Sequence, residues 1–283
     1  MSIKCKNLGY IYGVDTPFEF HALKNVDLQI EDGSFTAIIG QTGSGKSTLI
    51  QHINALLLPT SGEISVDEYT ISATQKPDSL KELRKKSGLV FQFPEYQLFE
   101  ETIEKDIIFG PMNFGVAEDE AKEIAKQSLK MVGLSEDYLD KSPFDLSGGQ
   151  KRRVAIAGIL AMNPDILILD EPTAGLDPQG TKEMMDLFKK INKIGKTVII
   201  VTHDMNHVLQ YCDHVIVMNE GKVEKKGTVK EIFQDSNYLN HLGIDLPLIT
   251  NLIIDLNKKG FHLDTSINNI NDLVEAIGGE LHG

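Results

Sequence analysis

The chain has 283 residues, enough for about two structural units when a domain averages roughly 150 residues. Its hydrophobic fraction of 41% and charged fraction of 24% are typical of globular proteins and disfavour a disordered or collagen-like chain. The formal net charge is -13, from 28 Lys and Arg against 41 Asp and Glu. Because such a surface repels phosphate backbones and anionic headgroups, we expect no nucleic-acid partner and no general binding to lipid surfaces.

Cys5 and Cys212 are the only cysteines, and neither belongs to a CxxC pair or a histidine cluster. The sequence therefore supports neither a disulfide framework nor a zinc site, which fits a reducing compartment. The N-terminus lacks the apolar stretch of a signal peptide, and the apolar runs, such as 197–201, are far shorter than the roughly 18 residues that span a bilayer. If the protein works at a membrane, we expect another chain to hold it there.

Hydrophobic periodicity divides the chain into a strand-rich first part, up to about Gln92, and a second part in which helical and strand-like segments alternate. Alternation of buried strands with helices predicts an α/β fold whose sheet is parallel at its centre. The expected strands are 26–30, 35–39, 63–66, 88–91, 166–169, 197–201 and 215–218. The expected helices are 117–134, 150–162 with Ser147 as N-cap, about 179–194, and a short helix from Asn206.

A phosphate-binding loop is predicted at 40–47, where GQTGSGKS matches GxxxxGK[ST] directly after the strand 35–39. In such a loop, glycines let successive backbone N–H groups turn toward phosphate oxygens, and the helix that begins near Lys46 adds its dipole. We expect Lys46 to reach the β- and γ-phosphates and the Ser47 hydroxyl to ligate Mg²⁺. The predicted nucleotide-binding residues here are Gly40, Gln41, Thr42, Gly43, Ser44, Gly45, Lys46, Ser47 and Thr48.

Two adjacent carboxylates, Asp170 and Glu171, follow the apolar strand 166–169. At the carboxyl edge of a parallel sheet they would lie beside the phosphate-binding loop, where Asp170 can bind Mg²⁺ through water and Glu171 can orient or deprotonate an attacking water. His203 follows the strand 197–201 in the same way and is a candidate contact for the γ-phosphate. Alone, such residues are equally typical of solvated turns, and the neighbouring loop favours the catalytic interpretation.

A second glycine-rich helix start, Leu146-Ser-Gly-Gly-Gln150, precedes ILILDE by some 20 residues. GxxxxGKS, LSGGQ and ILILDE in this order resemble the ATP-binding cassette (ABC) family over about residues 1–230. The resemblance implies a head-to-tail dimer in which each ATP lies between the phosphate-binding loop of one subunit and the LSGGQ segment of the other. Residues contacting the partner's nucleotide would then be Ser147, Gly148, Gly149 and Gln150.

The same resemblance implies roles for residues outside these motifs. Gln92 matches the glutamine that contacts Mg²⁺ and links the sheet to a helical subdomain, and His203 matches the switch histidine. Asp177 belongs to the D-loop at the dimer seam. An aromatic residue is expected to stack on adenine, and we favour Tyr12 over Tyr10. A GTPase is disfavoured because the chain lacks the NKxD motif, so the expected ligands are ATP and Mg²⁺.

The resemblance also implies a domain organisation. We expect an α/β P-loop NTPase of ABC type at 1–230, with a RecA-like mixed sheet, an N-terminal antiparallel β-subdomain and an inserted helical subdomain at 93–163. An α-rich tail would occupy 231–283. With eight acids against two bases, this tail carries -6 of the net charge of -13. Its amphipathic stretches make it a candidate dimerisation element.

FQFPEYQLF at 91–99, followed by ETIEKDIIFGP at 101–111, resembles the ATPases of energy-coupling factor (ECF) transporters. These are bacterial and archaeal uptake systems for vitamins and transition-metal ions. The resemblance implies that Gln92–Phe99 forms a groove for a coupling helix of the transmembrane T component, which would hold the chain at the cytoplasmic face of the cell membrane. The alternative is that these aromatic residues fill the core of the helical subdomain.

FPEYQLFEET and DTPFEFHALKNV resemble the second of the two paired ECF ATPases, often called A-prime. This implies a heterodimer with a second ABC ATPase and, beyond the T component, a substrate-binding membrane S component. Two alternatives stay open at this stage: the ATPase of another importer class, and a soluble ABC ATPase outside transport. The soluble class is disfavoured because the chain has one cassette, no coiled-coil insertion, no CxxC module and no basic patch.

Overall fold

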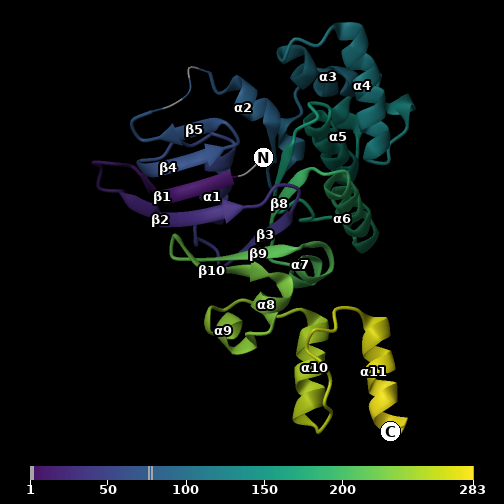
Figure 1. Cartoon of the computed structure of the whole chain (residues 1–283). Coiled ribbons are helices and arrows are strands. Elements are labelled where there is room, and N and C mark those ends of the chain that lie inside the picture. The colour runs from purple at the N-terminus through teal and green to yellow at the C-terminus, as the bar shows by residue number, and fades with distance from the viewer. Residues whose placement is uncertain (1–2, 76, 78, 283) are drawn as a thin grey trace.

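The computed structural model describes residues 3–75, 77 and 79–282, and it contains two sheets (Figure 1). A four-stranded antiparallel sheet has the order β2-β1-β4-β5, and a six-stranded sheet has the order β10-β9-β3-β8-β7-β6. In the second sheet β10 is antiparallel and the other neighbours are parallel, which confirms the expected mixed sheet and antiparallel subdomain. The strands are β1 (Ile3–Tyr12), β2 (Phe20–Ile30), β3 (Phe35–Ile39), β4 (Ser61–Val66), β5 (Tyr69–Ser72), β6 (Ser87–Val90), β7 (Ile166–Asp170), β8 (Thr197–Val201), β9 (His214–Asn219) and β10 (Lys222–Thr228).

Helices surround the six-stranded sheet and form a separate group, α3 to α5, at one end of the molecule (Figure 1). The α-helices are α1 (Lys46–Ile53), α2 (Lys81–Lys86), α3 (Ile103–Asn113), α4 (Glu118–Met131), α5 (Gly148–Leu160), α6 (Pro178–Lys193), α7 (Met205–Tyr211), α8 (Val229–Phe233), α9 (Ser236–His241), α10 (Leu248–Lys258) and α11 (Ile270–His282). The short 3₁₀ helices are η1 (Pro94–Gln97), η2 (Glu136–Tyr138) and η3 (Pro143–Asp145). The sequence did not predict α2, α3 or the 3₁₀ helices.

Every residue of β3, β7 and β8 is buried, because both faces of the sheet are covered. Alternate residues of β3 therefore enter different cores. Phe35, Ala37 and Ile39 belong to the core that contains residues of α3 to α6, whereas Ile38 belongs to the core shared with α1 and the antiparallel sheet. Burial on both faces explains why these strands read as continuous apolar runs in the sequence.

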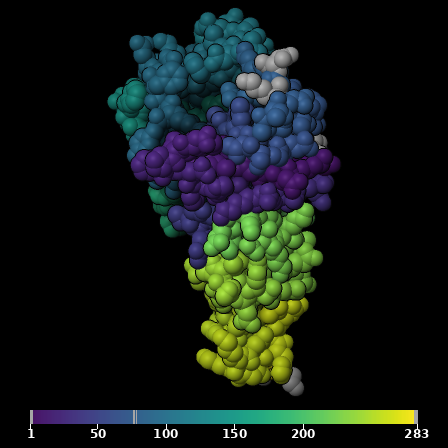
Figure 2. Space-filling model, turned by 90° about the vertical axis from the view of Figure 1, so that its left-hand side faces the viewer, coloured from purple at the N-terminus to yellow at the C-terminus, as the bar shows by residue number. Residues whose placement is uncertain are grey.

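The C-terminal helices α10 and α11 form a pair that extends away from the rest of the molecule (Figures 1 and 2). This pair has a small core of its own, centred on Ile253, Leu263 and Leu273. The main core, by contrast, continues through α8 and α9 as far as Leu246, beyond the predicted domain boundary at residue 230. Within the described residues no helix is both long and apolar enough to cross a membrane.

Phe188 on α6 is fully buried in the main core, so its packing can be tested directly. Phe188→Ala leaves a cavity and is expected to lower the free energy of unfolding by about 3–5 kcal/mol, measured by urea denaturation. Ile194→Ala, at the exposed residue directly after this helix, is the control and is expected to change it by less than about 0.5 kcal/mol. Equal effects of the two substitutions would contradict this packing.

Candidate functional site

The phosphate-binding loop joins buried strand β3 to helix α1, and two of its glycines stand where a side chain would clash with the backbone of other segments. Gly40 and Gly45 have positive φ angles of 148° and 100°. A Cβ would lie 2.1 Å from the Met218 carbonyl oxygen at Gly40, and 2.7 Å from the Ala22 carbonyl oxygen at Gly45. In the described part of the chain no side chain caps the N-terminus of α1, so its first N–H groups are available to a ligand. The loop is thus shaped to hold an anion.

A cavity of about 370 Å³ opens beside this loop. The Lys46 ammonium is buried there and donates hydrogen bonds to the carbonyl oxygens of Gly40 and Gln41, at 2.8 and 2.9 Å. Burial lowers the pKa of Lys46, and the charges of Glu171 and Asp170 oppose this shift. The buried Ser44 hydroxyl has no hydrogen-bond partner among the residues that the structure describes. The cavity lining comprises Phe20, Ala22, Thr42, Gly43, Gly45, Lys46, Ser47, Thr48, Gln92, Asp170, Glu171, Val201 and His203.

The two predicted carboxylates lie at the carboxyl end of β7, on the wall of this cavity. Burial raises the pKa of both, and the charge of Asp170 raises that of Glu171 further. The His203 Nε2 atom lies 3.2 Å from Glu171 Oε1. Burial, followed by the charge of Lys46, lowers the pKa of His203, which favours the neutral imidazole near pH 7. A carboxylate with a raised pKa beside a neutral histidine can accept a proton from a water molecule.

Ser47, Asp170 and Gln92, the predicted magnesium-binding residues, all line the cavity, and the Ser47 hydroxyl hydrogen-bonds Asp170. Among the described residues no group of three or more His, Cys, Asp or Glu side chains is placed to hold a metal by itself. The donor set still fits Mg²⁺, which is commonly held by one or two protein oxygens together with water and substrate phosphates. A metal here would thus be coordinated partly by these side chains and partly by phosphate oxygens of a bound nucleotide.

The LSGGQ segment and Asp177 do not line this cavity. Ser147 caps α5 through a capping box with Gln150, and Asp177 caps α6 by accepting a hydrogen bond from the Gly180 backbone at 2.6 Å. A Cβ at Gly148 would meet no atom of residues 3–75, 77 or 79–282 within 4 Å, so this face of the segment is open. Within one chain Ser147, Gln150 and Asp177 therefore have helix-capping roles. Contact of the segment and of Asp177 with a nucleotide stays a prediction.

Tyr12 and Tyr10 differ in their relation to the loop. The Tyr12 hydroxyl lies 3.3 Å from Thr48 Oγ1, and its ring is exposed. The Tyr10 ring instead packs edge-on against Tyr12 and His52, with ring centroids 4.8 Å apart in both cases. This geometry favours Tyr12 as the aromatic residue available to a base. Tyr12 is not among the residues that line the cavity, whereas Phe20, its cross-strand neighbour on β2, is. Phe20 was missed because the hairpin register is not evident from the sequence.

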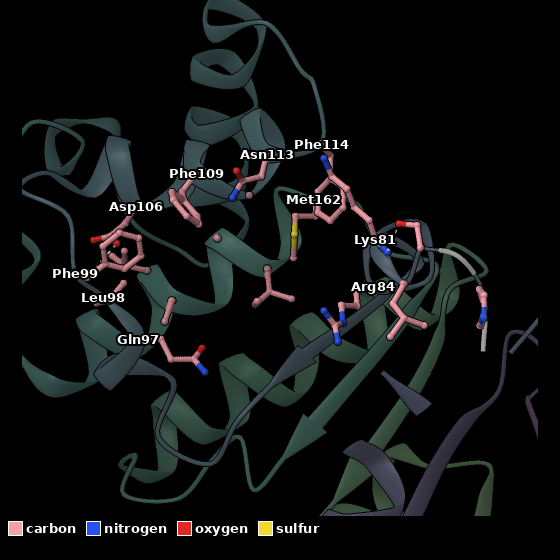
Figure 3. A pocket seen from close by; sticks show the side chains of 18 residues that line it. Lys81, Arg84, Gln97, Leu98, Phe99, Asp106, Phe109, Asn113, Phe114 and Met162 are labelled. Carbon is pink, nitrogen blue, oxygen red and sulfur yellow. Dashed lines mark hydrogen bonds between the residues drawn. The ribbon is translucent and has the colours of Figure 1, made fainter. Parts of the chain in front are cut away.

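A second and larger cavity, of about 830 Å³, lies between the segment after Gln92 and helices α2, α3 and α5 (Figure 3). Phe99 and Phe109 meet edge to face on its wall, with ring centroids 5.1 Å apart. They are 59% and 47% exposed, and nearby Tyr96 is 84% exposed, so these aromatic rings do not fill the subdomain core. We call this cavity the apolar groove; besides these two rings, its lining includes Lys81, Arg84, Gln97, Leu98, Asp106, Asn113, Phe114 and Met162.

Only the last three residues of the predicted groove segment, Gln97, Leu98 and Phe99, line the apolar groove. Gln92 lines the phosphate-loop cavity instead, so one short segment connects the two sites. The prediction of a groove at Gln92–Phe99 is therefore too broad at its N-terminal end. It also missed α2 and α3, which supply the opposite walls.

Comparison with known proteins defines the class. A family model described as ABC transporter matches residues 23–174, and the chain belongs to this family. The chain is 53% identical to the energy-coupling factor transporter ATP-binding protein EcfA2 of Streptococcus agalactiae serotype Ia, over 98% of this chain and 99% of that protein. It is 57% identical to the EcfA2 protein of Ligilactobacillus salivarius, over 92% of this chain and 90% of that protein.

Two solved structures resemble the fold. CbiO1 from Clostridium perfringens, described as part of the ABC transporter complex cbiONQ, has a TM-score of 0.73 at 43% identity, covering 89% of this chain and 98% of that chain. The ATP-binding cassette MJ0796, a dimer in a post-hydrolysis state bound to ADP and Pi, has a TM-score of 0.73 at 36% identity, covering 80% of this chain and 98% of that chain. The fold is therefore that of an ABC ATPase.

Lys46→Ala tests the phosphate-binding loop. Because charge-assisted hydrogen bonds contribute about 1.5–3 kcal/mol, loss of the ammonium is expected to raise the Kd for ATP by roughly 10- to 100-fold, measured by isothermal titration calorimetry. Lys190→Ala, at an exposed position on α6, is the matched control and should leave the Kd unchanged. An unchanged affinity in Lys46→Ala would show that ATP binds elsewhere.

Proposed function

We propose that this chain is the ATP-hydrolysing subunit of an ECF-type ABC transporter that takes up vitamins or transition-metal ions. The observation that carries the proposal is the pairing of two sites in one chain. A cavity with a phosphate-binding loop, two carboxylates and a histidine is joined through Gln92 to a separate apolar groove. The first site fits ATP hydrolysis, and the second fits attachment to a membrane component. The EcfA2 names of full-length relatives support this assignment.

In the proposed catalytic site, Lys46 and the loop N–H groups bind the phosphates. Ser47, Asp170 and Gln92 would hold Mg²⁺, which would supply positive charge to the β- and γ-phosphate oxygens. Glu171 orients and deprotonates the attacking water, supported by its raised pKa. His203, 3.2 Å from Glu171, positions that carboxylate and reaches the γ-phosphate. Tyr12 stacks on the adenine.

The proposed active unit is a head-to-tail heterodimer with a second ABC ATPase. Ser147, Gly148, Gly149 and Gln150 of each chain would contact the nucleotide of the other, and Asp177 would lie at the seam. The open face at Gly148 and the separation of LSGGQ from this chain's own cavity support that arrangement. ATP binding would close the dimer and hydrolysis would open it. The pair α10–α11 exposes Leu248, Leu252, Ile270 and Val274, which supports its role as a dimer contact.

The apolar groove is the proposed docking site for a coupling helix of a transmembrane T component, which would place the chain peripherally on the cytoplasmic face of the cell membrane. Exposed aromatic rings around an apolar cavity are typical of sites that receive an amphipathic helix. A separate S component would bind the transported substrate, so this chain supplies energy and not substrate selectivity. The acidic net charge of -13 favours specific docking over general attraction to anionic lipid.

Co-purification from membranes tests the assignment. The wild-type chain should bring down a second ATPase, the T component and a small substrate-binding membrane protein. Phe99→Asp places a charge in the apolar groove, so it should lose both membrane proteins while retaining the second ATPase. Phe18→Asp, at an exposed aromatic position outside the groove, is the control. Co-purification of a permease with its own extracellular binding protein would instead assign the chain to another importer class.

Glu171→Gln tests the chemical role of that carboxylate. Removing a positioned base is expected to lower ATP turnover in the assembled complex by about 10²- to 10³-fold, with the Kd for ATP nearly unchanged, because general-base catalysis typically contributes this much. Phosphate release measures the turnover, and Glu224→Gln at an exposed position on β10 is the control. Turnover close to that of wild type would show that another group activates the water.

A further inference from the structure

A largely buried ion pair joins helix α5 to the segment that follows Gln92. The Arg152 side chain is 4% exposed, and its partner Glu95, in η1, is 16% exposed. The guanidinium is bidentate: Nε donates to Glu95 Oε2 at 3.1 Å and Nη2 donates to Glu95 Oε1 at 3.0 Å. Since a buried arginine is stable only when its remaining donors also find partners, the rest of its contacts define what it connects.

The other donors of Arg152 reach backbone carbonyl groups in two loops. Nη2 also donates to the Gln92 carbonyl oxygen, at 3.4 Å, and Nη1 donates to the Ala174 carbonyl oxygen. The Phe93 ring lies over the guanidinium, 5.8 Å from centroid to Cζ. One side chain therefore holds three segments together: the helix that LSGGQ opens, the segment after Gln92, and the loop after β7.

Each of these segments belongs to a site described above. The segment after Gln92 begins in the phosphate-loop cavity and ends at Phe99 in the apolar groove. The Ala174 N–H donates to the Glu171 carbonyl oxygen at 3.2 Å, which closes a backbone turn that begins at the residue carrying the catalytic carboxylate. Glu171 has a φ of 49°, which a residue with a side chain rarely adopts without support from its surroundings. A shift of η1 would thus act on the loop of Glu171 through Arg152.

We propose that Arg152 is a positioning residue: together with Glu95 it sets the position of the loop 171–174 according to what occupies the apolar groove. This rests on the proposed function, because the groove is there assigned to a membrane component. Lysine cannot replace the arginine, since its single ammonium does not present donors in a planar fork toward a carboxylate and two carbonyl groups at once. The conservative substitution Arg152→Lys therefore removes the connection while keeping the charge.

The test uses the assembled ATPase complex in lipid vesicles. Arg152→Lys and Glu95→Gln are each expected to lower ATP turnover at saturating ATP by about ten-fold, the scale of a lost charge-assisted hydrogen bond, while the Kd for ATP changes by less than about two-fold. The double variant should resemble the single variants, because both changes break one connection. Transport per ATP should fall as well. Thermal unfolding shows that each variant is folded.

Arg153→Lys is the matched control. Arg153 is the next residue on α5, but it donates to the Val132 carbonyl oxygen and to Glu183, each at 2.8 Å, and touches neither Gln92 nor Ala174. Unchanged turnover in Arg152→Lys, additive effects in the double variant, or an equal loss in Arg153→Lys would overturn the inference. Wild-type vesicles that hydrolyse ATP without transport would overturn the proposed function instead, and the split between turnover and Kd would still decide the role of Arg152.

Discussion

The parallel pairing of β3, β7 and β8 is the constraint on which the site depends. Because adjacent parallel strands end at the same edge, the residues that follow each strand meet there although Gly40 and Glu171 are 131 positions apart in sequence. The phosphate-binding loop follows β3, Glu171 follows β7, and His203 follows β8. Complete burial of these strands fixes the register, since a slip would move every side chain into the other core.

This edge places buried charges close together, which has an energetic cost. Lys46 and Asp170 are both buried, and each has a pKa shifted toward its neutral form, with desolvation as the largest cause in both cases. Each charge also opposes the shift of the other, so the site is partly self-compensating. A nucleotide with its metal would bring further charges of both signs to the cavity. The folded chain therefore holds an arrangement that ligand binding can complete.

Much of this arrangement could be predicted from the sequence because it depends on local signals. A glycine-rich loop after an apolar strand, and acids after another, reveal both the chemistry and the edge at which it lies. The apolar groove was harder to predict from the sequence. Its wall includes α3, whose Gly110 and Pro111 are residues that usually end a helix, and packing of Ile103 and Ile107 into the main core overrides that tendency. Similarly, the sequence gives no sign that Arg152 differs from other helix residues, because its partners Glu95 and Ala174 lie 57 and 22 positions away.

The phosphate-loop cavity is proposed to be one half of an ATP site that the LSGGQ segment of a second ATPase completes. This central claim is tested most directly by a structure of the Glu171→Gln complex, trapped with ATP and Mg²⁺. Our account predicts phosphates on the backbone N–H groups of residues 43–48, the metal between Ser47 and the γ-phosphate, and the LSGGQ segment of the second ATPase against the same nucleotide. A nucleotide bound away from this loop, or one enclosed by a single chain without the second ATPase, would contradict it.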